Sequence, residues 1–199
     1  QNDRYTVQWK LLDDDTGELT GQGEVAVSNA KPEIKNVQLK SGVVDEGDTS
    51  NVVELTFDVE DPGTADEITI EIDWGDNRPP ASQVLERVGT APFQATYTYV
   101  YRDDDPTGTP SDGYTIKLKV TDDDDEFDEA EATITVNNVA PSELTLGDNL
   151  AIKFGEGAAF TAAYVDPGLD DDFSFTWTVT DPTGLSTTTT STDPTVGFI

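Results

Sequence analysis

The sequence predicts an all-β protein built from two-sheet sandwich modules in tandem. Many short segments alternate apolar and polar residues at period two, and no segment shows a convincing helical period of 3.6 residues. The second observation is an internal repeat without gaps. Six residues near the N-terminus have counterparts 109 positions later: Tyr5, Asp13, Val25, Val27, Asn29 and Pro32 correspond to Tyr114, Asp122, Ile134, Val136, Asn138 and Pro141. Such a fixed shift is typical of repeat proteins.

The repeat divides the chain into three parts. Residues 1–31 are expected to be the C-terminal hairpin of a truncated module, 32–140 a complete module, and 141–199 the N-terminal part of a further, diverged module. Thirty-one residues cannot bury a core alone, so the chain is expected to be an excerpt from a longer protein. Proline marks both boundaries, at Pro32 and Pro141, and lacks the N–H that a central strand needs.

The first part is predicted to be a hairpin around the turn 13–17. Its apolar face holds Tyr5, Val7, Trp9, Leu11, Val25 and Val27. In the complete module we expect strands near 34–39, 53–59, 68–74, 95–101, 114–120 and 130–136. An acidic turn is expected at 45–48, a long acidic loop at 102–112, and mixed signals cover 78–91. We place Trp74, Phe57, Ile70, Leu118 and Ile134 in the core.

The last part repeats the first half of a module. With a shift of 105, Asp166-Pro167-Gly168 repeats Asp61-Pro62-Gly63. Phe173, Phe175, Trp177 and Val179 take the places of Ile68, Ile70, Ile72 and Trp74. The sequence shows no final hairpin here, so this unit is expected to be incomplete.

Charge and composition narrow the possible functions. The chain holds 41 acidic and 11 basic residues, a net charge of −30, and neither cysteine nor histidine. Nucleic acid is therefore an unsuitable partner, and disulfides, thiol nucleophiles, the usual zinc ligands and a histidine base are excluded. Such a surface attracts cations, although simple solubility or a high-salt habitat would also explain it. No apolar run approaches the ~18–20 residues of a membrane helix.

Three motifs give the complete module a family resemblance. They are Ile72-Asp73-Trp74-Gly75-Asp76-Asn77, Thr96-Tyr97-Thr98-Tyr99, and the strand from Gly113 to Asp122. In this order they resemble the polycystic-kidney-disease (PKD) type domain. Asn77 stands where that family usually has glycine, and Ala95-Thr96 replaces its histidine. The resemblance implies immunoglobulin-like sandwiches in extracellular arrays, used as spacers, adhesive modules or accessory modules.

Acidic loops are the candidate metal sites. In an immunoglobulin-like topology the loops 61–67 and 122–129 lie at the pole that receives the incoming linker. Calcium takes 6–8 oxygen ligands from carboxylates, amide carbonyls and water. We therefore expect a calcium site at each junction: Asp61, Asp66, Asp122, Asp124 and Asn29 at the first, and Asp166, Asp171 and Asn138 at the next. A solvated acidic turn is the alternative.

Three further features have structural explanations as well as functional ones. Asp73 and Asp76 are expected to shape their own turn, although with residues 103–105 they would form a second acidic cluster. The tyrosines at 97, 99 and 101 are expected in the core, with a carbohydrate-stacking strip as the alternative. The run 186–192 is a polar edge strand or an O-glycosylated loop.

The sequence predicts a non-catalytic protein, because its acidic clusters lie on turns of a small sandwich with no deduced cleft. We expect a structural or adhesive segment of a long extracellular or cell-surface repeat protein, with calcium-stiffened junctions. Its partners would be neighbouring modules, other cell-surface proteins or glycans, without nucleic acid or membrane insertion. The alternative is an accessory carbohydrate-binding or protein-binding module of a secreted hydrolase.

Overall fold

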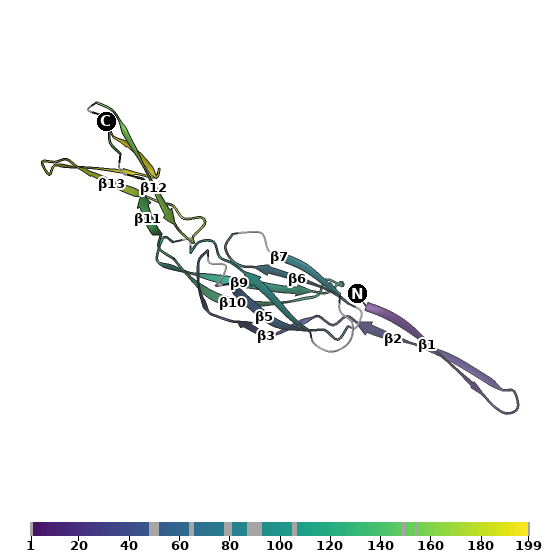
Figure 1. Ribbon diagram of the computed structural model, residues 1–199. Helices are drawn as coiled ribbons and strands as arrows, with labels where there is room; N and C mark the ends of the chain where they lie inside the picture. The colour runs from purple at the N-terminus through teal and green to yellow at the C-terminus, as the bar shows by residue number, and fades with distance from the viewer. Residues whose placement is uncertain are drawn as a thin grey trace. The chain divides into compact units, whose positions relative to one another are not determined.

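The computed structural model describes residues 2–47, 52–63, 66–77, 81–86, 93–104, 107–148, 150–153 and 155–198, with backbone only at residues 2 and 81–86. These residues form strands and loops, without a helix among them, so the predicted all-β class is confirmed (Figure 1). Accordingly, no described segment is a helix long and apolar enough to span a bilayer.

The chain forms two compact units. The first contains Gln1–Lys40, Glu54–Tyr97 and Thr115–Thr133, and the second contains Ser41–Val53, Thr98–Tyr114 and Ile134–Ile199. Strands β9 (Ser111–Thr121) and β10 (Phe127–Asn137) therefore contribute residues to both units.

The first unit contains a long hairpin and strands of two sheets. In the hairpin, β1 (Asn2–Leu12) pairs antiparallel with β2 (Glu18–Ser28) along its whole length. One sheet has the order β3-β5-β8, from Glu33–Leu39, Val53–Glu60 and Phe93–Tyr99. The other has the order β4-β10-β9-β6-β7, with β6 at Glu67–Asp73 and β7 at Ala81–Glu86. Its strand β4, at Val43–Asp45, belongs to the second unit.

Period-two alternation produces the core of the first unit, because every second side chain of a strand faces the same side. Side chains alternate between buried and half-buried along β5, and Phe57 is fully buried there. Trp74, Ile70 and Leu118 are also buried, as predicted. Tyr97 stacks on Phe57 with ring centroids 5.9 Å apart, so its ring packs on the core. This arrangement is consistent with a β-sandwich.

The second unit contains the opposite ends of β9 and β10 and the last five strands. Ile134 is buried here, also as predicted. One sheet has the order β11-β12-β15, and β13 pairs with β14. Their bounds are Ser142–Leu146, Ala158–Val165, Phe175–Thr180, Ser186–Ser191 and Thr195–Phe198 for β11 to β15. The threonine-rich run thus lies largely in β14, an exposed strand.

The acidic turn predicted at 45–48 begins one residue later in the structure, where residues 46–47 bend, and Asp48 lies outside the described residues. Val43–Asp45 before it forms β4, which pairs parallel with Thr135–Asn137 of β10. The N–H of Glu46 continues this ladder by donating to the Asn137 carbonyl at 3.0 Å. Two adjacent valines favour a strand here, and the pairing partner lies about ninety residues away, where sequence periodicity cannot find it.

Strand bounds repeat along the chain. Adding 109 to the bounds of β1 and β2 gives those of β9 and β10, and adding 105 to those of β5 gives β12. Pairing also repeats: β3 meets β5 at Glu33 and Glu60, and β11 meets β12 at Ser142 and Val165. Both pairings also carry a register shift, between Lys35 and Gln38 in β3 and between Ser142 and Thr145 in β11.

Candidate metal centre

An Asp-Pro-Gly turn follows β5 and places two carboxylates together. Proline at 62 ends the ladder, and the Asp61 Oδ1 atom accepts the Gly63 N–H at 2.7 Å. Asp66 then folds back over the turn: a Cβ added to Gly63 would lie 1.8 Å from the Asp66 Oδ2 atom. A side chain at residue 63 would therefore displace the Asp66 carboxylate from this position.

Asp122 connects the turn between β9 and β10 with the segment before Pro32. Its Oδ1 atom accepts the N–H groups of Asp124 at 3.0 Å and Glu126 at 2.9 Å. Its Oδ2 atom accepts the Asn29 side-chain amide at 2.7 Å. The structure therefore brings the predicted linker residue Asn29 to the predicted acidic turn.

A second contact ties the same linker to β10. Asp128 accepts the Lys31 ammonium group at 2.7 Å and the Ile34 N–H at 3.0 Å. The Ile34 N–H and then the Lys31 ammonium hold the pKa of this carboxyl below its usual value. Residues 29–34 are thus bound at both ends of the turn between β9 and β10, by Asp122 before the turn and by Asp128 after it.

Three of the predicted ligands form one cluster. Asp61, Asp66 and Asp122 each offer a carboxylate oxygen within 4.8 Å of the others. Asp61 and Asp122 are only 3% and 4% exposed. Burial raises the pKa of Asp66, and the charges of Asp61 and of residues 122–124 raise it further. The Asp66 Oδ2 atom is buried and accepts no hydrogen bond from the described atoms.

A second acidic centre surrounds Glu46, which the sequence analysis placed on an acidic turn. The Glu46 side chain is fully buried. Its Oε1 atom accepts the Val139 N–H at 2.7 Å, and its Oε2 atom accepts the Asp104 N–H at 2.9 Å. The pKa of Glu46 is nevertheless raised, because burial and the nearby charges of Asp104 and Asp103 outweigh these two hydrogen bonds.

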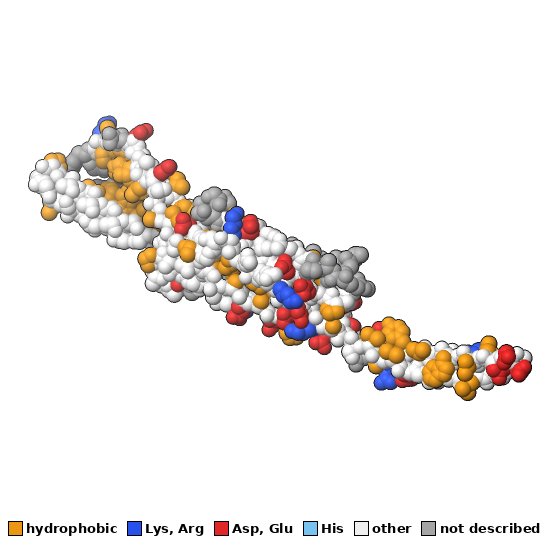
Figure 2. Space-filling model, turned by 90° about the horizontal axis from the view of Figure 1, so that it is seen from below, with side chains coloured by type: hydrophobic (Ala, Val, Ile, Leu, Met, Phe, Trp, Pro, Cys, Tyr) orange, Lys and Arg blue, Asp and Glu red, His pale blue; other side chains and the backbone are white. Residues whose placement is uncertain are grey.

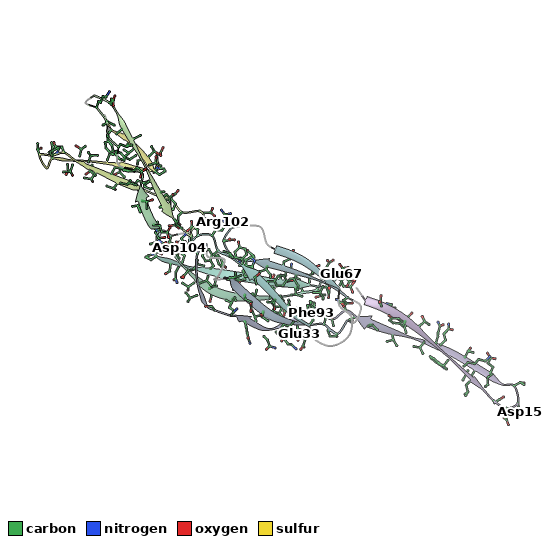
Figure 3. All side chains as sticks on the ribbon, in the orientation of Figure 1. Asp15, Glu33, Glu67, Phe93, Arg102 and Asp104 are labelled. Atoms are coloured by element: carbon green, nitrogen blue, oxygen red, sulfur yellow. The ribbon has the colours of Figure 1, made fainter. Side chains whose placement is uncertain are left out.

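Glu46 belongs to two groups of three carboxylates. One includes Asp166 and Asp171, and the other includes Asp103 and Asp104. Figure 3 labels Asp104 on the loop before β9, next to Arg102, whose guanidinium binds Asp170 at 3.0 Å. The structure thus groups Asp103 and Asp104 with Glu46, and Asp105 lies outside the described residues.

The Asp166 turn repeats the geometry of the Asp61 turn. The Asp166 Oδ1 atom accepts the Gly168 N–H at 2.8 Å, and a Cβ at Gly168 would lie 2.5 Å from the Asp171 Oδ2 atom. Burial raises the pKa of Asp171 to about 7, and the charges of Glu46, Asp166 and Asp103 add to this. A hydrogen bond with the Asp166 carboxyl also favours the protonated form.

The remaining predicted ligands lie beside these clusters. Asp124 is exposed and contributes its N–H to the Asp122 turn. Asn138 lines a hollow of about 560 Å³ together with Asp103, Asp104 and Asp171. Glu46 was missed as a candidate, although Glu156-Gly157 repeats Glu46-Gly47 and this repeat was the available signal.

Both clusters offer an oxygen-only ligand set. Close carboxylates repel one another, and neutralising them requires protons or a cation. Asp61, Asp66 and Asp122 fit calcium, because it accepts carboxylate oxygens in flexible geometry and the Asp66 Oδ2 atom has no hydrogen bond to lose within the described structure. Water would complete such a shell, and Asn29 is bound to it through the hydrogen bond from its side-chain N–H to Asp122.

The raised pKa of Asp171 predicts a pH dependence. In the folded chain the Asp171 carboxyl loses its proton at about pH 7, whereas an aspartate of the unfolded chain loses it at about pH 4. Folding stability contributed by this proton is complete at acid pH and is lost as the pH rises toward 7. Asp171→Asn removes this charge. At pH 8 in chelator the variant should therefore melt a few degrees above the unaltered chain, since a stability change of 1 kcal/mol shifts the melting temperature of a chain of this size by about 2–4 °C.

Exposed Asp172 supplies the matched control for this measurement. Asp172→Asn removes the same charge one residue away and should leave the pH profile of melting nearly unchanged. Equal effects of the two substitutions, or titration of the Asp171 carboxyl near pH 4 by NMR, would contradict the prediction.

Comparison with models of protein families finds no match, and comparison with curated proteins finds none either. Among solved structures, the chain has a TM-score of 0.34 and 16% identity to the Pseudomonas fluorescens alkylpurine DNA glycosylase AlkC bound to DNA, covering 54% of this chain and 31% of that one. The sporulation control protein Spo0M from Bacillus subtilis has a TM-score of 0.37 and 11% identity, with 54% of this chain and 50% of that one covered. The chicken CNTN1 FN1–FN3 domains have a TM-score of 0.25 and 12% identity, with 96% of this chain and 64% of that one covered. The chain thus spans less than two thirds of each.

Proposed function

We propose that this chain is a non-catalytic structural and adhesive segment of an extracellular repeat protein, made of PKD-like sandwich modules with calcium-stiffened junctions. The observation that carries the proposal is the cluster of Asp61, Asp66 and Asp122. It lies beside the linker residue Asn29, and its Asp66 Oδ2 atom is buried without a hydrogen bond to any described atom.

A cation there would act on the linker as well as on the turns. Asp122 already binds Asn29, so an ion held by Asp61, Asp66 and Asp122 would fix the linker through that side chain. The repeated Asp-Pro-Gly turn with Asp171 above Gly168 supports a second site of the same design, which includes buried Glu46. Repeated strand bounds support the tandem arrangement.

Calcium should therefore stabilise the chain by mass action. A hundredfold excess over the dissociation constant gives about 2.7 kcal/mol, and extracellular modules often bind at about 10⁻⁴–10⁻³ M, so the titration must reach millimolar calcium. We expect higher melting temperatures in calcium than in magnesium or chelator. In NMR spectra, calcium should shift the amides of Gly63 and Glu126, which belong to the two turns of the first cluster.

Asp122→Asn/Asp124→Asn should abolish the calcium shifts at Gly63. The equivalent pair in the β1–β2 turn gives a matched control, since Asp13 makes the same contacts to its own turn. Asp13→Asn/Asp15→Asn should leave the shifts unchanged. Equal melting in calcium and chelator would reject the calcium proposal, and an equal response to magnesium or sodium chloride would indicate a general effect of acidic surface.

A further inference from the structure

Two segments of the second unit, 46–47 and 101–104, form one surface, called here the exit surface. The Gly47 N–H donates to the Tyr101 carbonyl at 2.7 Å, which joins the two segments. Tyr101 is 1% exposed, and its ring packs on the buried ring of Tyr114 with centroids 4.6 Å apart. The backbone of the exit surface is therefore anchored in the core.

The chain that leaves β10 is bound to the same surface. The Val139 N–H donates to the Oε1 atom of buried Glu46 at 2.7 Å. Two residues earlier, the Asn137 side-chain amide donates to the Asp45 Oδ1 atom at 3.1 Å. The path of the chain is thus fixed before the last five strands begin.

The loop between β12 and β13 lies on the exit surface. The Leu169 N–H donates to the Arg102 carbonyl at 2.8 Å, and the Arg102 guanidinium binds Asp170 at 3.0 Å. A Cβ atom added to Gly47 would lie 1.5 Å from the Pro167 carbonyl oxygen, so the two backbones are in direct contact there. Linker and loop together attach the last strands to the exit surface at separate points.

Charge alone would keep these parts separated. The chain holds 41 acidic and 11 basic residues, and Figure 2 shows more red than blue side chains. The Arg102 guanidinium brings one of the few positive charges to the contact. Exposed ion pairs add little free energy, but a charge placed opposite the wrong partner is costly. The Arg102–Asp170 pair therefore suits a role in selecting the loop that binds.

The complete module contains a second loop for comparison. A shift of 105 relates Asp61-Pro62-Gly63 to Asp166-Pro167-Gly168, and in both turns the aspartate accepts the N–H of the glycine. In sequence, Ala65 stands at the position equivalent to Asp170. The two loops therefore share their turn and differ in the charge that would meet an arginine.

We propose that the exit surface is a docking site for the next module along the chain, and that it recognises an Asp-Pro-Gly loop with an acidic residue two positions after the glycine. The inference rests on the modular part of the proposed function and is independent of its calcium. Backbone contacts hold the loop, and the Arg102–Asp170 pair provides the selectivity. A module with alanine at this place, as Ala65 is in the complete module, docks less tightly on this surface.

Amide hydrogen exchange of the 199-residue chain in chelator tests the selectivity. The Leu169 N–H reports the docked loop, and the Gly47 N–H reports the exit surface itself. Asp170→Ala, which introduces the residue found at Ala65, should accelerate exchange at Leu169 about two- to fivefold, the contribution of an exposed ion pair, and leave Gly47 unchanged. Asp172→Ala removes the same charge from another exposed position and should change neither amide.

Charge reversal separates pairing from general loosening of the loop. Arg102→Asp should accelerate exchange at Leu169 at least as much as Asp170→Ala, because repulsion replaces attraction. Arg102→Asp/Asp170→Arg restores an opposite pair and should return this exchange toward that of the unaltered chain. Substitutions that merely loosened the loop would add their effects in the double variant instead.

Pairs of spin labels measure the docking itself, because the chain has no cysteine that would take up a label elsewhere. Ser111→Cys/Leu185→Cys places labels at two exposed positions of the second unit. In chelator the distance distribution should be narrow. Gly47→Ala should broaden it, because the added methyl group meets the Pro167 carbonyl, and Gly108→Ala should leave it narrow.

Three results would overturn the proposal. A distribution that is broad in chelator and narrow in calcium would mean that the ion makes the contact, and the calcium proposal would then stand alone. Unchanged exchange at Leu169 in both Asp170→Ala and Arg102→Asp would exclude selection by the ion pair. A narrow distribution in Gly47→Ala would mean that the linker alone fixes the last strands. Equal melting in calcium and chelator, by contrast, rejects only the calcium proposal.

Discussion

Phe57→Ala is expected to destabilise the first unit by about 3–5 kcal/mol, the usual cost of truncating a buried aromatic ring. Phe57 is fully buried on β5, and its ring carries the stacked ring of Tyr97. The substitution removes apolar contacts and leaves a cavity that the two flanking strands cannot close. Amide hydrogen exchange at Ile70 and Val120, which pair across β6 and β9, should accelerate accordingly.

Phe127→Ala is the matched control, because Phe127 begins β10 and is 46% exposed. Its ring contacts only the Lys119 ammonium group among the described ring contacts, at 4.4 Å from the ring centroid. Such an exposed cation–π contact is worth about 0.5–1 kcal/mol, so the control should lose little stability. Similar losses from both substitutions would contradict the placement of Phe57 in the core.

Gly47→Ala should disrupt the contact between residues 46–47 and the Asp-Pro-Gly turn of the second unit. Gly47 has φ +59°, and a Cβ there would lie 1.5 Å from the Pro167 carbonyl oxygen. That overlap cannot be relieved by a side-chain rotation, because both groups are fixed to the backbone. With about 1–2 kcal/mol of left-handed strain added, the total cost should exceed about 2 kcal/mol. Exchange should accelerate at Gly47 and Leu169, whose N–H groups donate to Tyr101 and Arg102.

Gly108→Ala separates the two contributions to this effect. Gly108 has φ +63°, and nothing lies within 4 Å of the position that a Cβ atom would take there. The substitution therefore adds the backbone strain without the collision and should leave exchange at Leu169 unchanged. An equally large loss in Gly108→Ala would mean that backbone strain alone explains the result.

Sequence periodicity predicted the strands and the core well, because both follow from local alternation. Leu55, Phe57 and Val59 are buried as the pattern required, and so are Ile70 and Ile72 on the facing sheet. The proximity of Asn29 to Asp122 was also predictable, since the repeat defined the linker and the topology defined the pole.

Buried Glu46 was not predictable from the same pattern. The sequence predicted only an acidic turn here, whereas the N–H groups that bind the Glu46 carboxylate come from Asp104 and Val139, far away in the sequence. Similarly, the back-folding of Asp66 over Gly63 depends on the space that glycine leaves, which spacing alone does not reveal. Contacts of this kind require the folded chain.

The parallel pairing of β4 with β10 has a mechanical consequence. The chain enters β4 from residue 42 and leaves β10 toward residue 138, so pulling on these two points slides the strands lengthwise in opposite directions. The hydrogen bonds from Thr135 to Gly42 and from Glu46 to Asn137 lie across that direction and are loaded together in shear. The β1–β2 hairpin, pulled at its adjacent ends, opens one residue pair at a time. Between residues 42 and 138, this short parallel ladder is therefore the element that bears tension.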